Sequence, residues 1–284
     1  MRRSRTMIRA LIGAALVAGS LVAVAPAAQA VIIPVACSET ALVDAVNLAN
    51  STSAADTLVL ASGCTYVLTS AHGGATDGLP VITTPIEMIG PAVITRGPLA
   101  LPFRIVEVST TGNLTLTTNV KISNGFAVGD GGGILNHGAV TLTGSSLSNN
   151  TATGDGGGLA NADTASGTAP SATFTNSPVN GNTAILRGGG IYNGLRGTLT
   201  ATGVTGSPLF IDHNTAALEG GGIAAVDSTA TTLTETAVTV NASGTNAGGV
   251  YRSHGTMTTT NSPITANTPD NCVGSAPAVP HCTG

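Results

Sequence analysis

Aromatic and charged residues are scarce in this sequence. Its 284 residues include no Trp, three Tyr and four Phe, and only 8% of them are charged. Lys121 is the sole lysine. Because a nucleic-acid-binding surface needs clustered cations and stacking aromatic rings, the composition disfavours nucleic acid as a partner.

Long apolar runs are also missing, apart from one near the N-terminus. The stretch from Ala10 to about Val24 follows four arginines and precedes Ala28-Gln29-Ala30, a small-x-small cleavage signature. This pattern predicts a signal peptide over residues 1–30, cleavage before Val31 and an exported, extracellular protein. The stretch is too short for a stable membrane span, and none is expected elsewhere. Without the four leader arginines, six basic residues face fourteen acidic ones, a formal net charge of −8.

Glycine, in contrast, is abundant and periodic. Five glycine clusters begin at residues 131, 156, 188, 220 and 248, so successive starts lie 25, 32, 32 and 28 residues apart. Asparagine follows nearly the same irregular rhythm at Asn124, Asn150, Asn182, Asn214, Asn241 and Asn267. Two independent markers with one rhythm indicate a stacked repeat, since a unit of this size cannot bury its apolar residues alone.

Short alternating segments lie between these markers. Each places one apolar residue between two threonines, as in Thr115-Leu116-Thr117, and the others begin at Thr141, Thr173, Thr198, Thr232 and Thr256. Threonine suits the outer face of a strand, and the apolar residue then points into a core. A second inward set follows, for example Leu147, Val179 and Val238 with Val240. The pattern predicts an all-β parallel β-helix with about three short strands per turn.

The two ends depart from this repeat. Ser38 is a good N-cap for an amphipathic helix over Glu39–Asn50, which would cover the open first coil. We expect an N-terminal cap over residues 31–56, the β-helix over residues 57–268, and a C-terminal tail over residues 269–284 that covers the other end.

All four cysteines lie near these ends, as Cys37, Cys64, Cys272 and Cys282. In an oxidising compartment the even count indicates disulfides, although the sequence alone allows three pairings. Pairing of sequence neighbours is favoured because a rigid rod holds its ends far apart. A metal site is disfavoured, since zinc-type Cys-x-x-Cys spacing is missing and only His281 is nearby.

Two short elements recur in the repeat. Gly-Gly-Gly-Ile-x-Asn occurs at Gly131–Asn136 and Gly188–Asn193, and Asn-Thr-Ala begins at Asn150, Asn182 and Asn214. In these motifs the chain resembles the repeats of bacterial polymorphic-outer-membrane-type proteins, which belong to the pectate-lyase-like right-handed β-helix group. The resemblance covers about Thr57 to Thr268. It implies a right-handed coil and a bacterial extracellular protein, and it implies no particular activity.

The residue ahead of each glycine cluster is a candidate for chemistry. These residues are Asp130, Asp155, Arg187 and Glu219, with Ala247 ahead of the fifth cluster. Stacked coils would align them in a column about 5 Å apart. The carboxylates could hold Ca²⁺ against an acidic sugar, and Arg187 could assist proton abstraction, as a polysaccharide lyase needs. A surface charge ladder, with Arg187 neutralised by Asp155 and Glu219, is the simpler interpretation.

The other polar residues favour structural interpretations. The repeated asparagines are expected to stack as amide ladders that hold the turns. His72, His137, His213, His254 and His281 share no repeat position. His213 adjoins Asp212, but no paired Ser or Cys nucleophile is evident.

Three functions follow from these patterns. We expect first a secreted, non-enzymatic scaffold or adhesin-like protein that binds a polysaccharide or a cell surface, without a cofactor. A polysaccharide lyase or glycosidase that uses the charged column, with Ca²⁺ in the lyase case, is the first alternative. Ice binding is the second, because the Thr-x-Thr columns resemble the ice-binding face of some β-solenoid antifreeze proteins. The variable coil length argues against ice binding, because the lateral alignment of the threonines would then change from coil to coil.

Overall fold

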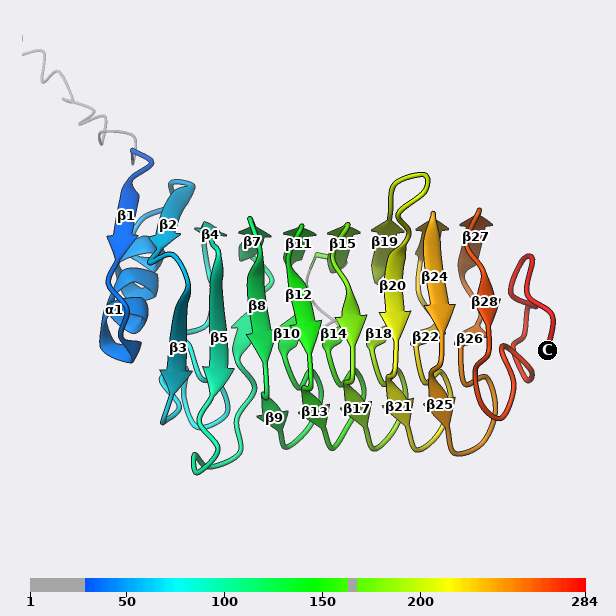
Figure 1. The fold of residues 1–284 in the computed structure, drawn as a ribbon. Coiled ribbons are helices and arrows are strands. Elements are labelled where there is room, and N and C mark those ends of the chain that lie inside the picture. Colours follow the sequence, from blue (N-terminus) through cyan, green and yellow to red (C-terminus); the bar gives the residue numbers. More distant parts are fainter. Residues whose placement is uncertain (1–28, 163–167) are drawn as a thin grey trace, which may run out of the picture.

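The chain folds as a right-handed parallel β-helix (Figure 1). The computed structural model describes residues 29–162 and 168–284, so nearly all of the expected signal peptide lies outside the described residues. Strands of successive coils lie side by side and pair in parallel. Within the described ranges α1 (Glu39–Asn50) is the only helix. The predicted fold class is confirmed.

Four sheets run along the rod, and we name them A to D in the order in which one coil visits them. Sheet A contains β1 (Ile32–Val35), β2 (Asp56–Leu60), β4 (Pro85–Ile89), β7 (Asn113–Thr117), β11 (Ala139–Thr143), β15 (Ser171–Thr175), β19 (Thr198–Thr202), β23 (Ala230–Thr234) and β27 (Thr256–Thr260). Sheet B contains β3 (Cys64–Leu68), β5 (Ala92–Arg96), β8 (Val120–Ser123), β12 (Ser146–Ser148), β16 (Val179–Asn180), β20 (Leu209–Asp212), β24 (Thr236–Thr239) and β28 (Ile264–Thr265).

The other two sheets close each coil. Sheet C consists of two-residue strands, β9 (Phe126–Ala127), β13 (Thr151–Ala152), β17 (Thr183–Ala184), β21 (Thr215–Ala216) and β25 (Ala242–Ser243). Sheet D contains β6 (Val106–Val108), β10 (Ile134–Asn136), β14 (Leu159–Asn161), β18 (Ile191–Asn193), β22 (Ile223–Val226) and β26 (Val250–Ser253). Sheets A, B and D supply the expected three strands in six of the turns, and sheet C adds a short strand to most coils.

The strands of sheet A keep a constant register although the coil length varies. Thr115 pairs with Thr141, and Thr141 pairs with Thr173. Connections outside the strands, such as the projecting loop between β19 and β20, absorb the length differences (Figure 1). In β19 and β27 the threonines in this register are Thr200 and Thr258, two residues later than the sequence pattern suggested. A two-residue shift keeps every side chain on its face, because strand side chains alternate.

Apolar side chains of all coils stack into one continuous core. Leu116, Leu142, Phe174 and Leu233 line the inner side of sheet A and are completely buried. Burying a side chain of this kind contributes about 1.5–3 kcal/mol relative to exposure. Val240, which the pattern placed inside, is instead 49% exposed, because it lies after β24 in a turn with a φ of 57°.

A ladder of buried asparagines holds the turn between sheets B and C. Each member donates its backbone N–H and its Nδ2 to the Oδ1 of the next, at 2.9–3.0 Å, in the order Asn150, Asn182, Asn214, Asn241 and Asn267. The predicted ladder is thus confirmed, except at Asn124. There the N–H of Gly125 takes the ladder position and donates to Asn150 Oδ1 at 3.0 Å, while Asn124 lies one residue earlier in a left-handed turn.

A second ladder and the glycine clusters hold each coil at sheet D. Asn136 Nδ2 donates to Asn161 Oδ1 at 2.7 Å, and Asn161 Nδ2 donates to Asn193 Oδ1 at 2.8 Å. The middle glycine of a cluster leaves no room for a side chain, since a Cβ on Gly157 would lie 2.4 Å from the carbonyl oxygen of Gly189. Successive coils therefore touch through backbone alone at this corner.

The N-terminal end of the coil is covered as the sequence predicted. Ser38 Oγ accepts the Ala41 N–H at 3.2 Å at the start of α1, and the buried side of the helix packs on the first coil. The Cys37–Cys64 disulfide ties the residue before the N-cap to β3. β1, which precedes the helix, pairs with β2 and begins sheet A.

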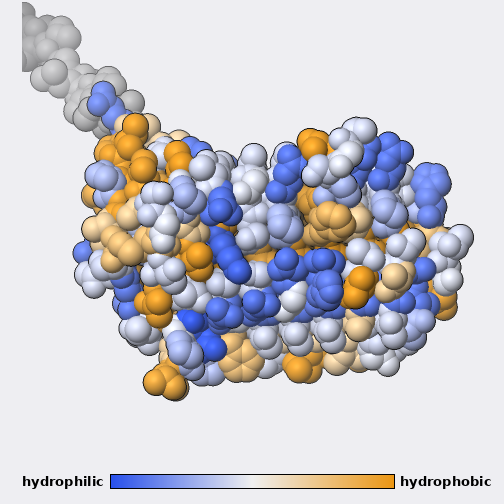
Figure 2. All heavy atoms as spheres, viewed as in Figure 1, coloured by the Kyte–Doolittle hydropathy of each residue, from blue (hydrophilic) through white to orange (hydrophobic). Residues whose placement is uncertain are grey.

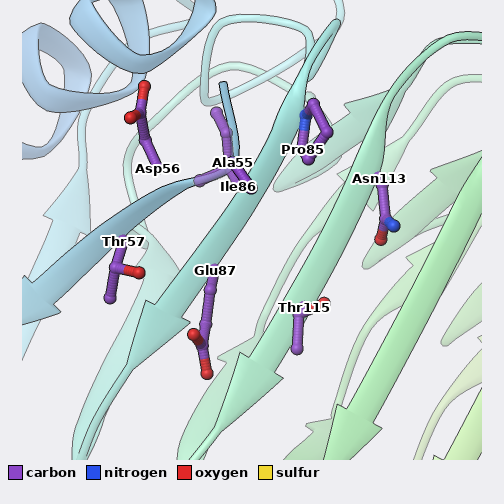
Figure 3. A pocket seen from close by; sticks show the side chains of 8 residues that line it. All are labelled: Ala55, Asp56, Thr57, Pro85, Ile86, Glu87, Asn113 and Thr115. Carbon is purple, nitrogen blue, oxygen red and sulfur yellow. The ribbon is translucent and has the colours of Figure 1, made fainter. Parts of the chain in front are cut away.

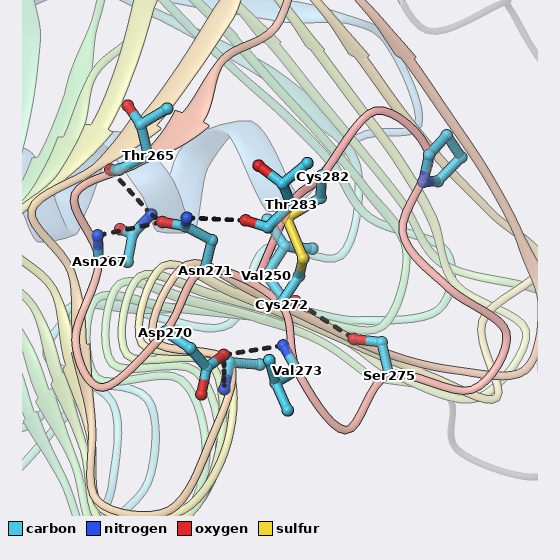
Figure 4. Close-up of a disulfide and its surroundings, with 12 residues drawn as sticks. Val250, Thr265, Asn267, Asp270, Asn271, Cys272, Val273, Ser275, Cys282 and Thr283 are labelled. Atoms are coloured by element: carbon cyan, nitrogen blue, oxygen red, sulfur yellow. Dashed lines mark hydrogen bonds between the residues drawn. A yellow bond between two sulfur atoms is a disulfide. The ribbon is translucent and has the colours of Figure 1, made fainter.

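The C-terminal tail covers the other end and is closed by the Cys272–Cys282 disulfide (Figure 4). Asn271 ends the asparagine ladder, because its Oδ1 accepts the backbone N–H of Asn267 at 3.2 Å and the Nδ2 at 3.1 Å. The tail also pairs with the last strand of sheet D through a bridge between Ser253 and Ala276, and His254, the residue after that strand, donates its N–H to the Ala276 carbonyl. Both disulfides confirm the pairing of sequence neighbours.

Candidate functional site

The predicted charged column exists beside sheet D, one residue per coil. The backbone of each glycine cluster hydrogen bonds to the column residue of the following coil, which fixes their alignment. The side chains of Asp130 and Asp155 each contact the next column residue. Glu219 does not join this chain of contacts, because in the described part of the protein no ion pair or hydrogen bond links it to Arg187.

The column carboxylates hold the backbone of the next coil. Asp130 Oδ1 accepts the Asp155 N–H at 2.8 Å, and Asp155 Oδ1 accepts the Arg187 N–H at 2.8 Å. Asp155 is 7% exposed, and burial raises the pKa of its carboxyl although Arg187 opposes the shift. A general base has to reach a substrate proton. A buried carboxylate with one oxygen fixed on the backbone is better suited to stabilising the stack.

Arg187 connects the column to the outer face of sheet D. Its guanidinium lies 5.7 Å from the centroid of the Tyr192 ring, within cation–π range. The Arg187 Nε also lies 3.5 Å from Asp155 Oδ1. Gly194 makes room for the ring, because a Cβ there would lie 2.6 Å from Tyr192 Cε1. Burial, and then the negative charge of Asp155, raises the pKa of the Tyr192 phenol.

Tyr251 occupies the same outward register position as Tyr192, two strands further along sheet D. Tyr192 pairs with Ala224, which pairs with Tyr251, and Ala224 is completely covered. Both rings are partly exposed, whereas Tyr66 is buried and donates its hydroxyl to the Val35 carbonyl. Every surface tyrosine of the chain therefore lies on this face, with the two positions roughly 10 Å apart along the rod.

Toward the N-terminal end, this face continues through small and apolar side chains to a buried charge cluster. Arg104 lies against Asp77, and its Nη1 is 3.4 Å from Glu107 Oε2. Burial, and then the charge of Asp77, raises the pKa of the Glu107 carboxyl. Carboxylates thus border the strip on which the two tyrosines stand.

Neither surface tyrosine was among the residues predicted from the sequence. A signal was present, because each is the second residue after its glycine cluster, in Gly190-Ile191-Tyr192 and Gly249-Val250-Tyr251. The equivalent residues of the neighbouring coils include Ala160 and Ala224, so the tyrosines alternate with small residues. The position is therefore defined by the repeat, as the second residue after a glycine cluster.

The histidines do not share a site. His213 Nδ1 lies 3.2 Å from Asp212 Oδ2, and His254 Nδ1 lies 2.9 Å from Asp227 Oδ1, both with largely exposed rings. Among the residues that the structure describes, no group of three or more His, Cys, Asp or Glu side chains could hold a metal ion.

The surface hollows lie on other faces. One of about 380 Å³ opens at the N-terminal end of sheet A, where Thr57, Glu87 and Thr115 stand side by side on adjacent strands (Figure 3). Another of about 540 Å³ adjoins Arg96 and Asn124 beside sheet B. The face that carries sheet B is largely hydrophilic along the coil, and apolar residues gather at the N-terminal cap (Figure 2).

Comparison with protein-family models, with curated proteins and with solved structures finds no match. In the described chain no helix has the length and apolar character needed to cross a membrane.

Proposed function

We propose that this is a secreted, non-enzymatic protein that binds a neutral polysaccharide along the outer face of sheet D. The observation that carries the proposal is the equivalent placement of Tyr192 and Tyr251, roughly 10 Å apart along the rod. This distance is close to the length of two linked sugar rings. Tyrosine offers an apolar ring to the C–H side of a sugar and a hydroxyl to its polar edge. A glycan chain that lies along the rod would contact both rings.

The charges around the tyrosines favour a neutral chain over an acidic one. The negative charges of Asp155, Asp130 and Asp227 all raise the pKa of the Tyr192 phenol, and the positive charge of Arg187 opposes them. A uronic-acid polymer would bring further carboxylates to this face and be repelled. The local excess of negative charge therefore argues for neutral sugars.

Secretion is supported by three features of the chain. The segment before Val31 has the pattern of a cleaved signal peptide. Both cysteine pairs form disulfides, which are typical of oxidising compartments. The glycine and asparagine motifs resemble the repeats of polymorphic-outer-membrane-type and pectate-lyase-like bacterial proteins, which fits an extracellular role.

The non-enzymatic assignment rests on the use of the column residues. A lyase or glycosidase needs an acid and a base that reach the substrate. One carboxylate oxygen of Asp130 and one of Asp155 each accept a backbone N–H of the next coil, so we assign the column to holding the coils together.

The test is a binding measurement on the secreted protein with variants of sheet D. Titration calorimetry with neutral and acidic oligosaccharides, together with pull-down on insoluble polysaccharides, should show binding to a neutral chain. Tyr251→Ala should weaken that binding at least tenfold, and Tyr251→Phe should retain most of it because the ring remains. The matched control is Phe210→Ala, which removes a ring that is 45% exposed on sheet B.

Two outcomes would overturn the proposal. Equal affinities of the Tyr251→Ala and Phe210→Ala variants would place the binding elsewhere. Release of shortened or unsaturated oligosaccharides, detected by mass spectrometry and lost in Arg187→Ala, would make the column an active site.

A further inference from the structure

Sheet A presents an unusually uniform outer face. Two columns of threonine run across six successive strands: Thr115, Thr141, Thr173, Thr200, Thr232 and Thr258 in the first, and Thr117, Thr143, Thr175, Thr202, Thr234 and Thr260 in the second. We call this surface the threonine face. The third outward position of these strands holds Asn113, Ala139, Ser171, Thr198, Ala230 and Thr256, so the face carries no charge and no aromatic ring.

The hydroxyls of the threonine face are almost entirely unused by the protein. Among the described residues of the two columns, Thr117 is the only member whose hydroxyl makes a protein hydrogen bond, to Glu87 Oε1 at 3.2 Å, and in the third position the Thr256 hydroxyl donates to the Thr229 carbonyl at 2.9 Å. Glu87 lies in β4 and pairs with Thr115 of β7. It marks the N-terminal border of the face, beside the hollow in Figure 3. The other hydroxyls are free to hydrogen bond to water or to a ligand.

The face repeats in two directions. In-register parallel strands set a step of about 4.8 Å along the rod, and every second residue sets a step of about 6.7 Å along each strand. Threonine is stiff at χ1, so identical neighbours present hydroxyl and methyl in the same arrangement. Both steps are close to repeats of the oxygen lattice of hexagonal ice. The constant register removes the objection that variable coil length raises against such a match.

We propose that the threonine face binds ice, as a second surface independent of sheet D. Hydroxyls of neighbouring columns would hydrogen bond to rows of water molecules spaced as in the ice lattice, and the methyl groups would order the water between these rows. A glycan is a poorer occupant of the threonine face, because this face has no aromatic ring or charged group to hold a sugar.

The test compares the secreted protein with variants of the two faces in freezing solution. The wild-type protein should shape ice crystals into facets and be enriched in slowly grown ice. Thr173→Lys with Thr200→Lys, adjacent in the first column, should abolish both effects, while Thr239→Lys on sheet B should leave them unchanged. Thr200→Val keeps the β-branched shape and should weaken them, which separates loss of hydroxyl from misfolding. Exclusion of the wild-type protein from ice, or full activity of the double lysine variant, would overturn the proposal.

A different observation concerns the predicted processing site. The Val31 backbone nitrogen lies 2.7 Å from Asp56 Oδ1, and Thr52 Oγ1 donates to the other oxygen at 3.2 Å. Asp56 is 2% exposed, and within the described residues no cation contacts it. A buried carboxylate without a positive partner is costly.

We infer that cleavage before Val31 supplies this missing charge. Hydrolysis of the Ala30–Val31 peptide bond adds water, leaves a carboxylate on Ala30 and creates an α-ammonium group on Val31. That ammonium would form a charge-assisted hydrogen bond with Asp56 and fasten β1 to β2. The inference rests on the secretion proposed above, and processing thereby completes the first strand of sheet A.

Intact mass and thermal unfolding of the secreted chain test this inference. The mature N-terminus should be Val31, and this chain should unfold several degrees above one that retains Ala28–Ala30. The difference should vanish in Asp56→Asn, and it should shrink as the pH rises above about 8, where an α-amino group begins to lose its proton. Asp44→Asn on the exposed side of α1 serves as the control. Equal melting temperatures, or a secreted chain that begins elsewhere, would overturn the inference without affecting either binding proposal.

Discussion

Asn182 donates two hydrogen bonds to a single oxygen, Oδ1 of Asn214, from its backbone N–H at 3.0 Å and from its Nδ2 at 2.9 Å. Its own Oδ1 receives the same pair from Asn150. Each amide is therefore both acceptor for one coil and donor for the next. This relationship links the coils through buried polar groups that have no access to water.

Replacing Asn182 with Ala should destabilise the whole coil. The change removes the oxygen that accepts the Asn150 N–H and the Nδ2 that donates to the Leu147 carbonyl, so these two buried backbone groups lose a partner. We expect a loss of about 2–4 kcal/mol in the free energy of unfolding, measured by guanidinium titration. Asn180→Ala, two residues earlier and outside the ladder, should cost less than 1 kcal/mol. Comparable losses in the two variants would contradict the role of the ladder.

Asp155 should make stability depend on pH. Burial raises the pKa of its folded carboxyl above the ordinary value of 3.8, so the folded state holds this proton more tightly than the unfolded state. Stability should then fall as pH rises from the ordinary to the raised pKa and stay level above it. Asp155→Asn keeps the acceptor for the Arg187 N–H and should flatten this part of the curve, although Glu107, whose pKa is raised too, leaves some slope.

The matched substitution separates charge from hydrogen bonding. Asp155→Ala loses the acceptor and should cost about 1–3 kcal/mol at every pH between 4 and 8. Guanidinium unfolding of the three proteins across this range measures both effects. A slope in Asp155→Asn identical to that of the wild-type protein would show that Asp155 does not cause the dependence.

Much of the fold could be predicted because the repeat markers have local physical causes. Glycine is needed where coils touch through backbone, and asparagine where a buried side chain must satisfy backbone groups, so both recur once per coil. The helix after Ser38 and the neighbouring disulfides follow from equally local signals.

The sequence predictions were wrong where two alignments of the repeat satisfy the same local pattern. A shift of two residues in β19 leaves the alternation intact, so only the backbone pairing shows that Thr200 joins the column. At Asn124, a residue that tolerates left-handed backbone lies next to the glycine that fills the ladder position. The equivalence of Tyr192 and Tyr251 spans coils of different length and becomes visible only when residues are aligned by their glycine clusters.

The Cys272–Cys282 disulfide should protect the end of the coil rather than its centre. The tail accepts hydrogen bonds from the last strand of sheet D and from the residue after it: the Val250 N–H donates to the Asn271 carbonyl and the His254 N–H to the Ala276 carbonyl. In Cys272→Ser with Cys282→Ser we expect the tail to open, so that these two amides exchange hydrogen faster. Hydrogen exchange followed by mass spectrometry measures this, with the amide of Gly157 in the middle of the rod as the internal control. Uniform acceleration along the rod would instead mean that the tail controls global stability.

Gly190 should tolerate no side chain, although its backbone is compatible with one. A Cβ at this position would lie 2.6 Å from the Gly222 carbonyl oxygen and 3.0 Å from Asn214 Cγ, so Gly190→Ala has to separate two coils or displace the ladder. We expect a loss of about 3 kcal/mol or more, or failure of the protein to fold. Gly206 provides the contrast, because its φ of +84° strains an alanine while nothing lies within 4 Å of the added Cβ. Gly206→Ala should therefore cost only about 1–2 kcal/mol. Secretion yield and guanidinium unfolding of the two variants separate close packing from backbone strain, and a milder effect at Gly190 than at Gly206 would show that the coils can move apart at little cost.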